Sequence, residues 1–177
     1  RRQLLEQSGL KFTLAPKFEC DEHYPATMPA CDVAEYLSQL KSKAYPKALQ
    51  RGDILLTADT VVIAQNTILG KPADREDAVR MLNMLSGCEH TVITGVTMRT
   101  ESTIKSFSVA SKVFFRDITD EEIDYYIDNY RPFDKAGAYG IQEWIGYIGI
   151  DKIEGSYFTI MGLPVHLVYQ ELLKFIG

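Results

Sequence analysis

The sequence has few of the residues that mark several large classes of protein. Among its 177 residues there are three cysteines and three histidines, and no CxxC pair or histidine spacing typical of a zinc site occurs. No apolar run approaches the roughly 18 residues that a membrane-spanning helix needs, and no signal peptide is visible. A sparse, odd number of cysteines is typical of a reducing compartment. We therefore expect a cytoplasmic protein that does not act at a membrane.

Basic residues are also in the minority. Lys and Arg number 19 against 24 Asp and Glu, which gives a formal net charge of −5. A nucleic-acid-binding protein usually has a basic excess or a basic stripe, so we expect no nucleic-acid partner. The phosphate-binding pattern GxxxxGK[ST] and the nucleophile pattern GxSxG are both absent. A polyanionic substrate would therefore need a local basic pocket or a metal ion.

The composition is that of a globular protein, with 46% hydrophobic and 24% charged residues. A domain of this length buries about 70% of the surface that its unfolded chain exposes. Helices are expected at residues 1–8, from 32 to either about 46 or 49, and at 74–86, 119–130 and 164–175. Strands are expected at 12–15, 54–64, 91–98, 104–115, 147–153 and 158–161. This alternation predicts one α/β domain over residues 1–177, with a mixed, bent sheet flanked by helices.

Three residue choices predict where helices begin. Asp32 followed by Glu35, and Thr119 followed by Glu122, have the spacing of a capping box. Asp74 is placed as a simple N-cap. Residues 91–98 and 104–115 are predicted to pair as an antiparallel hairpin, and residues 68–72 to form a turn.

Asp59 is the first candidate for chemistry, because it interrupts the apolar run at residues 54–64. A carboxylate in a buried strand is costly unless something uses it. Desolvation raises the pKa of such a group, and a neighbouring cation or metal lowers it; either condition suits a general base or a metal ligand. The alternative is a strand-end carboxylate that caps nearby amides, and the residues alone favour neither.

Other charged candidates have an ordinary interpretation beside the functional one. Gly70 and Lys71 suit close approach to a phosphate, or form an ordinary turn before a helix. Lys41 on the preceding helix is a phosphate ligand or a solvated lysine, and Glu22 a magnesium ligand or a solvated loop charge. Arg1 and Arg2 carry guanidinium groups, which suit phosphate.

The segment DKAGAYGIQ at residues 134–142 is the richest candidate loop. Its two glycines leave room for a ligand against the backbone, and Lys135 adds a positive charge. The amide of Gln142 carries a donor and an acceptor, which together can read the edge of a base. The alternative is a glycine-rich loop with an internally bonded glutamine.

Taken together, these segments resemble the Maf family of nucleotide pyrophosphatases. The matching motifs, in chain order, are ADT (58–60), ILGKP (68–72), MLNMLSG (81–87), HTV (90–92), TGV (94–96), DKAGAYGIQ (134–142), IEGS (153–156) and MGLP (161–164). The resemblance covers essentially the whole chain. It implies an α/β fold akin to the inosine triphosphatase superfamily, and hydrolysis of a nucleoside triphosphate between its α- and β-phosphates with a divalent metal, Mg or Mn. Members of this family often form homodimers, and the residues of this chain leave its oligomeric state open.

The family opens with a strand and a Ser-x-Pro-Arg-Arg turn that binds phosphate. Aligning Leu4 and Leu5 with the family's Leu-Leu makes Arg1 the second arginine of that turn. A shift of one residue makes Arg1 and Arg2 the pair. On either alignment we expect the strand, the serine and the proline of the family's opening to be missing from this chain.

The resemblance also implies roles for individual residues. Asp59 matches the family's proton acceptor, and Thr60 and Gln142 match positions associated with the branch that prefers dTTP and UTP. A sister branch that prefers 7-methyl-GTP has glutamate at both of these positions. The resemblance therefore implies pyrimidine triphosphates, modified ones included, as substrates.

Basic residues of the family lie near the phosphates at the positions of Lys41, Lys71 and Lys135. Asp59 and Glu22 are the expected metal ligands. Two other functions stay open: a sanitising hydrolase of non-standard purine triphosphates, by superfamily analogy, and a non-catalytic regulator of cell division, because the family carries an association with septum formation.

Overall fold

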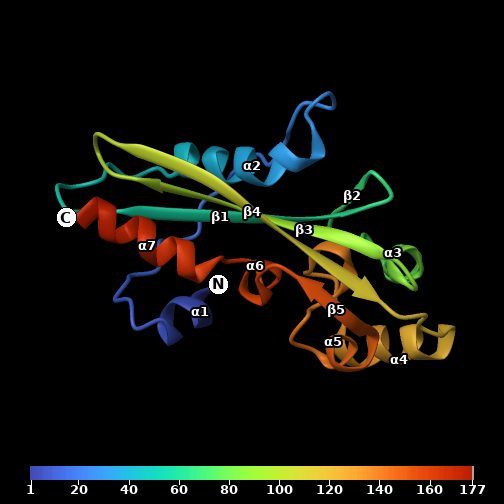
Figure 1. Ribbon diagram of the computed structural model, residues 1–177. Helices are drawn as coiled ribbons and strands as arrows, with labels where there is room; N and C mark the ends of the chain where they lie inside the picture. The colour runs from blue at the N-terminus through green and yellow to red at the C-terminus, as the bar shows by residue number, and fades with distance from the viewer. Residues whose placement is uncertain (177) are drawn as a thin grey trace. The chain divides into compact units, whose positions relative to one another are not determined.

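Helices and one five-stranded antiparallel sheet make up the computed structural model, which describes residues 1–176 (Figure 1). The strand order is β2-β1-β3-β4-β5. The strands are β1 (Leu55–Ala64), β2 (Thr67–Leu69), β3 (Glu89–Arg99), β4 (Ile104–Phe115) and β5 (Ile150–Glu154). The helices are α1 (Arg2–Gln7), α2 (Ala30–Ala44), α3 (Arg75–Leu85), α4 (Asp120–Tyr130), the 3₁₀ turn η1 (Ala136–Ala138), α5 (Trp144–Gly149), α6 (Tyr157–Ile160) and α7 (Val165–Ile176).

The contacts of the chain divide it into two compact units, and each is assembled from separate segments. Unit 1 holds Arg1–Asp59, Thr94–Val109 and the chain from Gly162 onward. Unit 2 holds Thr60–Ile93 and Ala110–Met161. Strands β1, β3 and β4 each continue from one unit into the other, because all three contain a unit boundary.

In unit 1, helix α2 packs directly against strand β3. A side chain at Gly95 would lie 2.3 Å from backbone atoms of Ala34 and Glu35, so the helix and the strand approach as closely as a glycine permits. The face of α2 toward the interior is buried at Val33, Ala34 and Leu37. The sequence pattern of this helix is therefore that of an amphipathic segment with one interior face.

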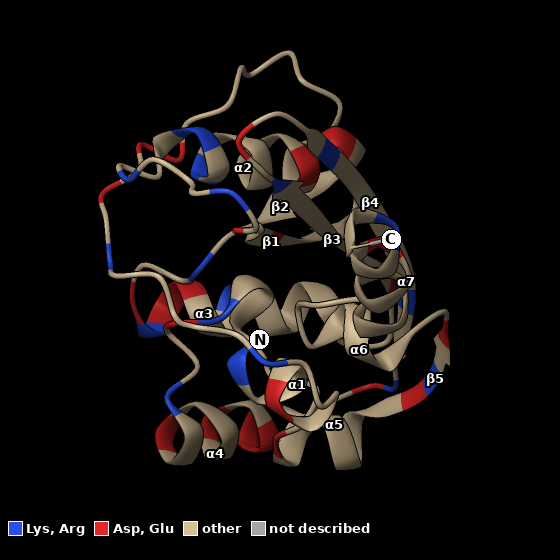
Figure 2. Ribbon diagram, turned by 90° about the vertical axis from the view of Figure 1, so that its left-hand side faces the viewer, with Lys and Arg blue, Asp and Glu red and all other residues tan. Residues whose placement is uncertain are grey.

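Unit 2 contains a hydrophobic core built from β1, β3 and β4 and the helices α3 and α4. Its largest fully buried side chains include Leu82, Leu85, Ile123 and Tyr126. On the surface, Arg75 of α3 pairs with two aspartates of α4, at 2.8 and 3.2 Å. Figure 2 marks the acidic residues along α4 in red on the ribbon. Such exposed ion pairs add little stability, so the apolar contacts hold the two helices together.

Strands β1 and β2 form a tight hairpin that the sequence did not suggest. Ala64 pairs with Thr67, and the two residues between them, Gln65 and Asn66, both have positive φ angles of 49° and 61°. Two left-handed residues in succession make the type of turn that closes two-residue hairpins. The predicted turn at 68–72 was therefore placed too late, since β2 already occupies part of it.

Many of the predicted elements are confirmed. Helices α1 and α7 and strands β1, β3 and β4 lie within a few residues of the prediction. The side chain of Asp74 accepts from the backbone N–H of Asp77 at the start of α3. Thr119 and Glu122 form both bonds of the capping box that begins α4. No helix within residues 1–176 is long and apolar enough to cross a bilayer.

Four local predictions were wrong. Residues 12–15 form no strand, and helix α2 begins at Ala30 after Pro29, without a capping bond from Asp32. The apolar residues 144–149 form helix α5 before β5, and residues 157–160 form helix α6. Short apolar runs fit a buried helix as well as a strand, which is why the pattern failed here.

The predicted α/β class is confirmed, but the sheet is antiparallel rather than mixed. The β1–β2 hairpin explains the difference. It reverses the chain before α3, so β3 begins in unit 2 and returns toward unit 1, opposite to β1. A helix that followed β1 directly would have produced the parallel arrangement that the alternation of elements suggested.

Candidate active site

Lys41 and Asp59 form a close ion pair in unit 1. The Lys41 Nζ atom lies 2.5 Å from Oδ1 of Asp59 and 3.2 Å from Oε1 of Glu22. Both partners of the shorter pair are largely buried, with side chains 20% and 13% exposed. Salt screens a pair that is shielded from water less than it screens a surface pair, so the attraction between these charges is stronger. This attraction holds the Lys41 ammonium beside the two carboxylates.

A hydroxyl network fixes the helix that carries Lys41 to the strand that carries Asp59. The Thr57 hydroxyl donates to the backbone oxygen of Ser38 at 2.7 Å, which joins β1 to α2. The Ser38 hydroxyl lies 2.7 Å from that of Thr97 on β3, and Thr97 lies 2.9 Å from Ser106 on β4. Since these groups are buried or half-buried and bonded, they specify the position of α2 against the sheet.

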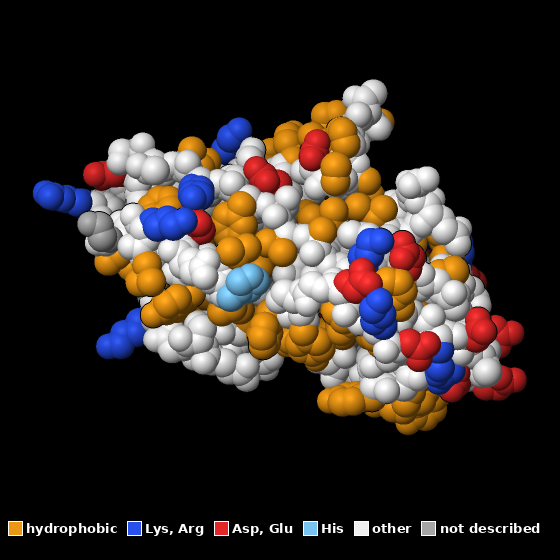
Figure 3. Space-filling model, viewed as in Figure 1, with side chains coloured by type: hydrophobic (Ala, Val, Ile, Leu, Met, Phe, Trp, Pro, Cys, Tyr) orange, Lys and Arg blue, Asp and Glu red, His pale blue; other side chains and the backbone are white. Residues whose placement is uncertain are grey.

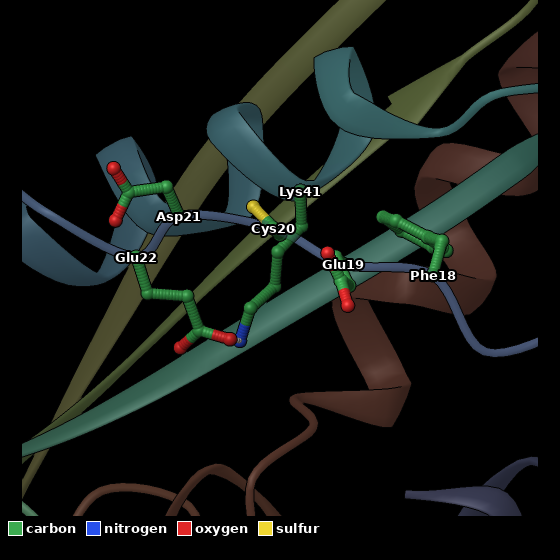
Figure 4. A pocket seen from close by; sticks show the side chains of 6 residues that line it. All are labelled: Phe18, Glu19, Cys20, Asp21, Glu22 and Lys41. Atoms are coloured by element: carbon green, nitrogen blue, oxygen red, sulfur yellow. Dashed lines mark ion pairs between the residues drawn. The ribbon is translucent and has the colours of Figure 1, made fainter.

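A pocket of about 620 Å³ lies beside this ion pair, and Figure 4 shows the side chain of Lys41 extending toward Glu22. It is lined by Phe18, Glu19, Cys20, Asp21, Glu22 and Lys41. Burial raises the pKa of the Cys20 thiol, and the nearby Glu22 carboxylate raises it further. The thiol therefore stays protonated and is a poor nucleophile, so the reactive groups of the pocket are its charged side chains.

Arg1 belongs to the same charged group. Its Nε atom donates to the backbone oxygen of Gly162 at 2.8 Å. Burial of the guanidinium lowers the pKa of Arg1, while the carboxylates of Asp59 and Glu22 act in the opposite direction. Arg2 is placed differently: it pairs with Glu6 one helical turn away, at 2.7 Å, with 65% of its side chain exposed. The structure thus brings only the first of the two predicted arginines to the carboxylates.

The expected metal ion can be tested against these residues. Within residues 1–176 no three His, Cys, Asp or Glu side chains are grouped so as to hold a metal. Asp59 and Glu22 nevertheless converge on one cation, the Lys41 ammonium. Mg²⁺ is commonly held by one or two carboxylates, with substrate phosphates and water completing its shell. The donor set therefore fits a divalent ion that arrives with a triphosphate.

In unit 2, the loop at 134–142 is bonded to the Gly70-Lys71 turn. The Gly137 N–H donates to the Gly70 oxygen at 3.0 Å, and Gly137 has a φ of 69°, which favours glycine. The hydrogen bond with Lys135 lowers the pKa of Asp134, and the charge of Lys71 adds to the shift. Lys71 is exposed and so is available to an anionic ligand.

Lys135 is held by acidic neighbours. Its Nζ atom lies 2.8 Å from Oδ1 of Asp134 and 3.1 Å from Oε1 of Glu143. Burial lowers the pKa of Lys135, but these two hydrogen bonds outweigh it, so its pKa lies above the ordinary value. Thr60 is half-buried and Gln142 is exposed, which leaves the Gln142 amide free to meet a ligand.

Two functional candidates of unit 2 were missed by the sequence reasoning. Glu143 accepts from both Lys135 and the hydroxyl of Tyr126, and Tyr126 also accepts from the Gly140 N–H at 3.0 Å. Glu143 directly follows Gln142, and this position beside a candidate ligand-reading residue was the only available signal. Tyr126 looked like an ordinary core residue of an amphipathic helix.

The candidate residues are divided between the two units. Unit 1 supplies a largely buried carboxylate at Asp59 with the ammonium of Lys41 beside it and the guanidinium of Arg1 nearby. Unit 2 supplies the exposed cation of Lys71 and the amide of Gln142. A carboxylate can act as a general base, cations can stabilise phosphate charge, and an amide can bond to the edge of a base.

Comparison with known proteins gives one consistent result. The family model described as Maf-like protein matches residues 1–175. A dTTP/UTP pyrophosphatase of Porphyromonas gingivalis strain W83 is 50% identical over 177 residues, which cover 99% of this chain and 89% of that protein. Proteins of the same name from Bacteroides thetaiotaomicron and Flavobacterium johnsoniae are 48% and 43% identical, covering 98% and 97% of this chain and 90% and 88% of their own lengths. The chain therefore belongs to the Maf family.

Proposed function

We propose that this protein is a nucleoside triphosphate pyrophosphatase that hydrolyses dTTP and UTP, and modified pyrimidine triphosphates, to the monophosphate and pyrophosphate. The observation that carries the proposal is the largely buried Asp59 carboxylate, held 2.5 Å from the Lys41 ammonium in mid-strand. The substrate class follows from the relatives, which bear the name dTTP/UTP pyrophosphatase at up to 50% identity over the length of the chain.

In this mechanism Asp59 accepts the proton of a water molecule that attacks the α-phosphorus. The new bond joins the water oxygen to that phosphorus, and the bond to the bridging oxygen of the β-phosphate breaks, so pyrophosphate leaves with the bonding electrons. Lys41 and Arg1 offset the charge of the phosphates. The charged groups of unit 1 are thereby assigned to the reaction itself.

Asp59 and Glu22 are the residues that would hold Mg²⁺ or Mn²⁺. The bound ion supplies neutralisation of the triphosphate and polarisation of a phosphoryl oxygen. The convergence of both carboxylates on the Lys41 ammonium supports this assignment.

Substrate selection is assigned to unit 2. The Gln142 amide donates to O4 of thymine or uracil and accepts from N3–H, whereas guanine presents a different edge. A site built for one hydrogen-bonding edge discriminates strongly, because the wrong base leaves polar groups unpaired. We place Thr60 beside the Gln142 amide and propose that Lys71 and Lys135 bind the phosphates.

A pyrophosphate-release assay tests the proposal, with Mg²⁺ or Mn²⁺ and a panel of dTTP, UTP, CTP, ATP, GTP, ITP and XTP. We expect turnover of dTTP and UTP above all others, and loss of turnover with EDTA. Preference for ITP or XTP would instead favour the sanitising hydrolase of purine triphosphates. No metal-dependent hydrolysis of any nucleotide would favour a non-catalytic role in cell division.

The remaining expectations are part of the same proposal. We propose that residues 1–177 unfold as one cooperative domain of the inosine triphosphatase-like type, since three strands continue through both compact units. Loss of amide protection from hydrogen exchange at the same denaturant concentration in both units would support this. Two separate unfolding transitions would contradict it. The homodimer and the cytoplasmic location stay predictions; light scattering and cell fractionation test them.

A further inference from the structure

Gln142 lies in a four-residue turn whose two ends meet at one buried hydroxyl group. The backbone N–H of Glu143 donates to the oxygen of Gly140 at 3.0 Å, which closes the turn. The hydroxyl of Tyr126 accepts from the Gly140 N–H at 3.0 Å and donates to the Glu143 carboxylate. One side chain of helix α4 thus holds both the first and the last residue of the turn.

The second oxygen of Glu143 is bonded as well. It lies 3.1 Å from the Nζ atom of Lys135, which also pairs with Asp134 at 2.8 Å. The Glu143 side chain is 20% exposed and Tyr126 is fully buried, so the bonds of Glu143 to Tyr126 and Lys135 are shielded, whereas Asp134 is 79% exposed. Shielded, charge-assisted hydrogen bonds are the stronger ones, and they restrict a loop more than exposed pairs do.

Gly140 makes this arrangement sterically feasible. A Cβ atom at this position would lie 3.0 Å from both Cδ of Glu143 and Cε of Lys135. Any larger residue would therefore push apart the two side chains that hold the turn. The contacts that hold the turn therefore explain why residue 140 is a glycine, without a ligand against the backbone.

We propose that Tyr126 and Glu143 form a clamp, supported by Lys135, and that they are positioning residues that aim the Gln142 amide at the base of the substrate. The inference rests on the proposed function and deepens it. Gln142 is exposed, so the direction of its side chain depends on the backbone of the turn. A turn that is held at both ends presents the amide in one direction, which is what discrimination between base edges needs.

The consequence is a specific kinetic signature. When the clamp is loosened, Gln142 is still present but adopts several directions. Binding of the correct base weakens, and the penalty for the wrong base shrinks. Tyr126→Phe and Glu143→Ala should therefore raise KM for dTTP and reduce the ratio of kcat/KM for dTTP over that for GTP by roughly tenfold, a factor typical of one lost positioning contact. Effects on kcat should be smaller than effects on this ratio.

Matched variants separate this role from a general loss of structure. Tyr125→Phe removes a hydroxyl from the exposed neighbour of Tyr126, and Glu154→Gln removes an exposed carboxylate of β5 that pairs with Lys152. Both controls should keep the wild-type ratio. Glu143→Gln, whose amide oxygen can still accept one bond, should restore part of what Glu143→Ala loses. Thermal unfolding of each variant reports its folding.

The decisive arm repeats Glu143→Ala in a Gln142→Ala background. If Glu143 acts through Gln142, the second substitution causes no further loss of selectivity. An unchanged ratio in Tyr126→Phe and Glu143→Ala, or an equal loss with and without Gln142, would overturn the inference. If the wild-type protein hydrolyses no nucleotide, the proposed function fails; calorimetric binding of dTTP and GTP to the same variants then decides whether the clamp selects the base.

Discussion

The Lys41 ammonium lies 2.5 Å from Oδ1 of Asp59 and joins helix α2 to the middle of strand β1. Nothing in the sequence spacing of these two residues requires them to meet, because they lie on different elements 18 positions apart. The pair exists because the Thr57 hydroxyl and the close approach at Gly95 fix the helix on the sheet.

Asp59→Asn keeps the size of the side chain and removes its basicity. We expect kcat for dTTP to fall by about 10² to 10⁴, the range found when a general base is lost, with the fold intact. Pyrophosphate release and circular dichroism measure the two effects. Asp32→Asn, an exposed aspartate on α2, is the control and should be fully active. Near wild-type turnover by the Asp59 variant would exclude its role as the proton acceptor.

Lys41→Met removes the charge but keeps much of the side-chain length. We expect kcat/KM for dTTP to fall about 10²-fold, as when one electrostatic contact to the reacting group is deleted. Lys43→Met, an exposed lysine of the same helix, should change little. Steady-state kinetics of both variants make the comparison. Equal behaviour of the two would show that Lys41 does not contact the phosphates.

Gly95→Ala tests the contact between α2 and β3. The added methyl group would lie 2.3 Å from backbone atoms of Ala34 and Glu35, which cannot rotate away. We expect a loss of about 1–3 kcal/mol in the free energy of unfolding, typical of overpacking, measured by urea denaturation. At Gly70 a Cβ atom meets nothing within 4 Å, so Gly70→Ala should stay within about 0.5 kcal/mol of the wild type. Similar stability for both variants would contradict the close approach.

His90 gives the stability of the fold a pH dependence. Burial lowers the pKa of His90 from its ordinary 6.5 to about 4. Nε2 of its ring lies 2.7 Å from the Tyr139 hydroxyl, and Nδ1 is buried without a hydrogen-bond partner within residues 1–176. The unfolded chain therefore takes up a proton at a higher pH than the folded chain does. Stability falls as the pH drops from about 6.5 to about 4, by about 3 kcal/mol in all, and this contribution is constant outside that window.

The measurement is the difference in unfolding free energy between the wild type and His90→Gln at several pH values. Subtraction is needed because carboxylates with lowered pKa values, such as Glu122, titrate in the same range. We expect the stability advantage of the wild type to shrink steadily below pH 6.5. A difference that does not change with pH would mean that the pKa of His90 is the same in the folded and the unfolded chain.

The sequence predicted the elements with strong periodicity and clear caps, such as α3, α4 and β1. It failed where short apolar runs decide between helix and strand, as in α5 and α6. The β1–β2 hairpin was missed because Gln65-Asn66 lacks the glycine that usually marks such a turn. One missed reversal was enough to change the expected strand directions from mixed to antiparallel.

At the site, local features singled out Asp59, a carboxylate in an apolar strand, and Gln142, a polar residue in a glycine-rich loop. Lys41 was placed near the phosphates only by the family resemblance, because a lone lysine on a helix is usually solvated. Tyr126 and Glu143 were not singled out, since their importance depends on a hydroxyl that is buried only after α4 packs against the loop. Arg2 looked equivalent to Arg1 in the sequence. They differ in the structure because helix α1 places Arg2 one turn from Glu6, with which it pairs.

The contact between Gly95 and Ala34 also limits how this enzyme can be redesigned. Two backbone segments meet there without a side chain between them, so α2 cannot come closer to β3 and no larger residue fits at position 95. A redesign of the substrate range must therefore leave this contact unchanged and act on side chains away from it.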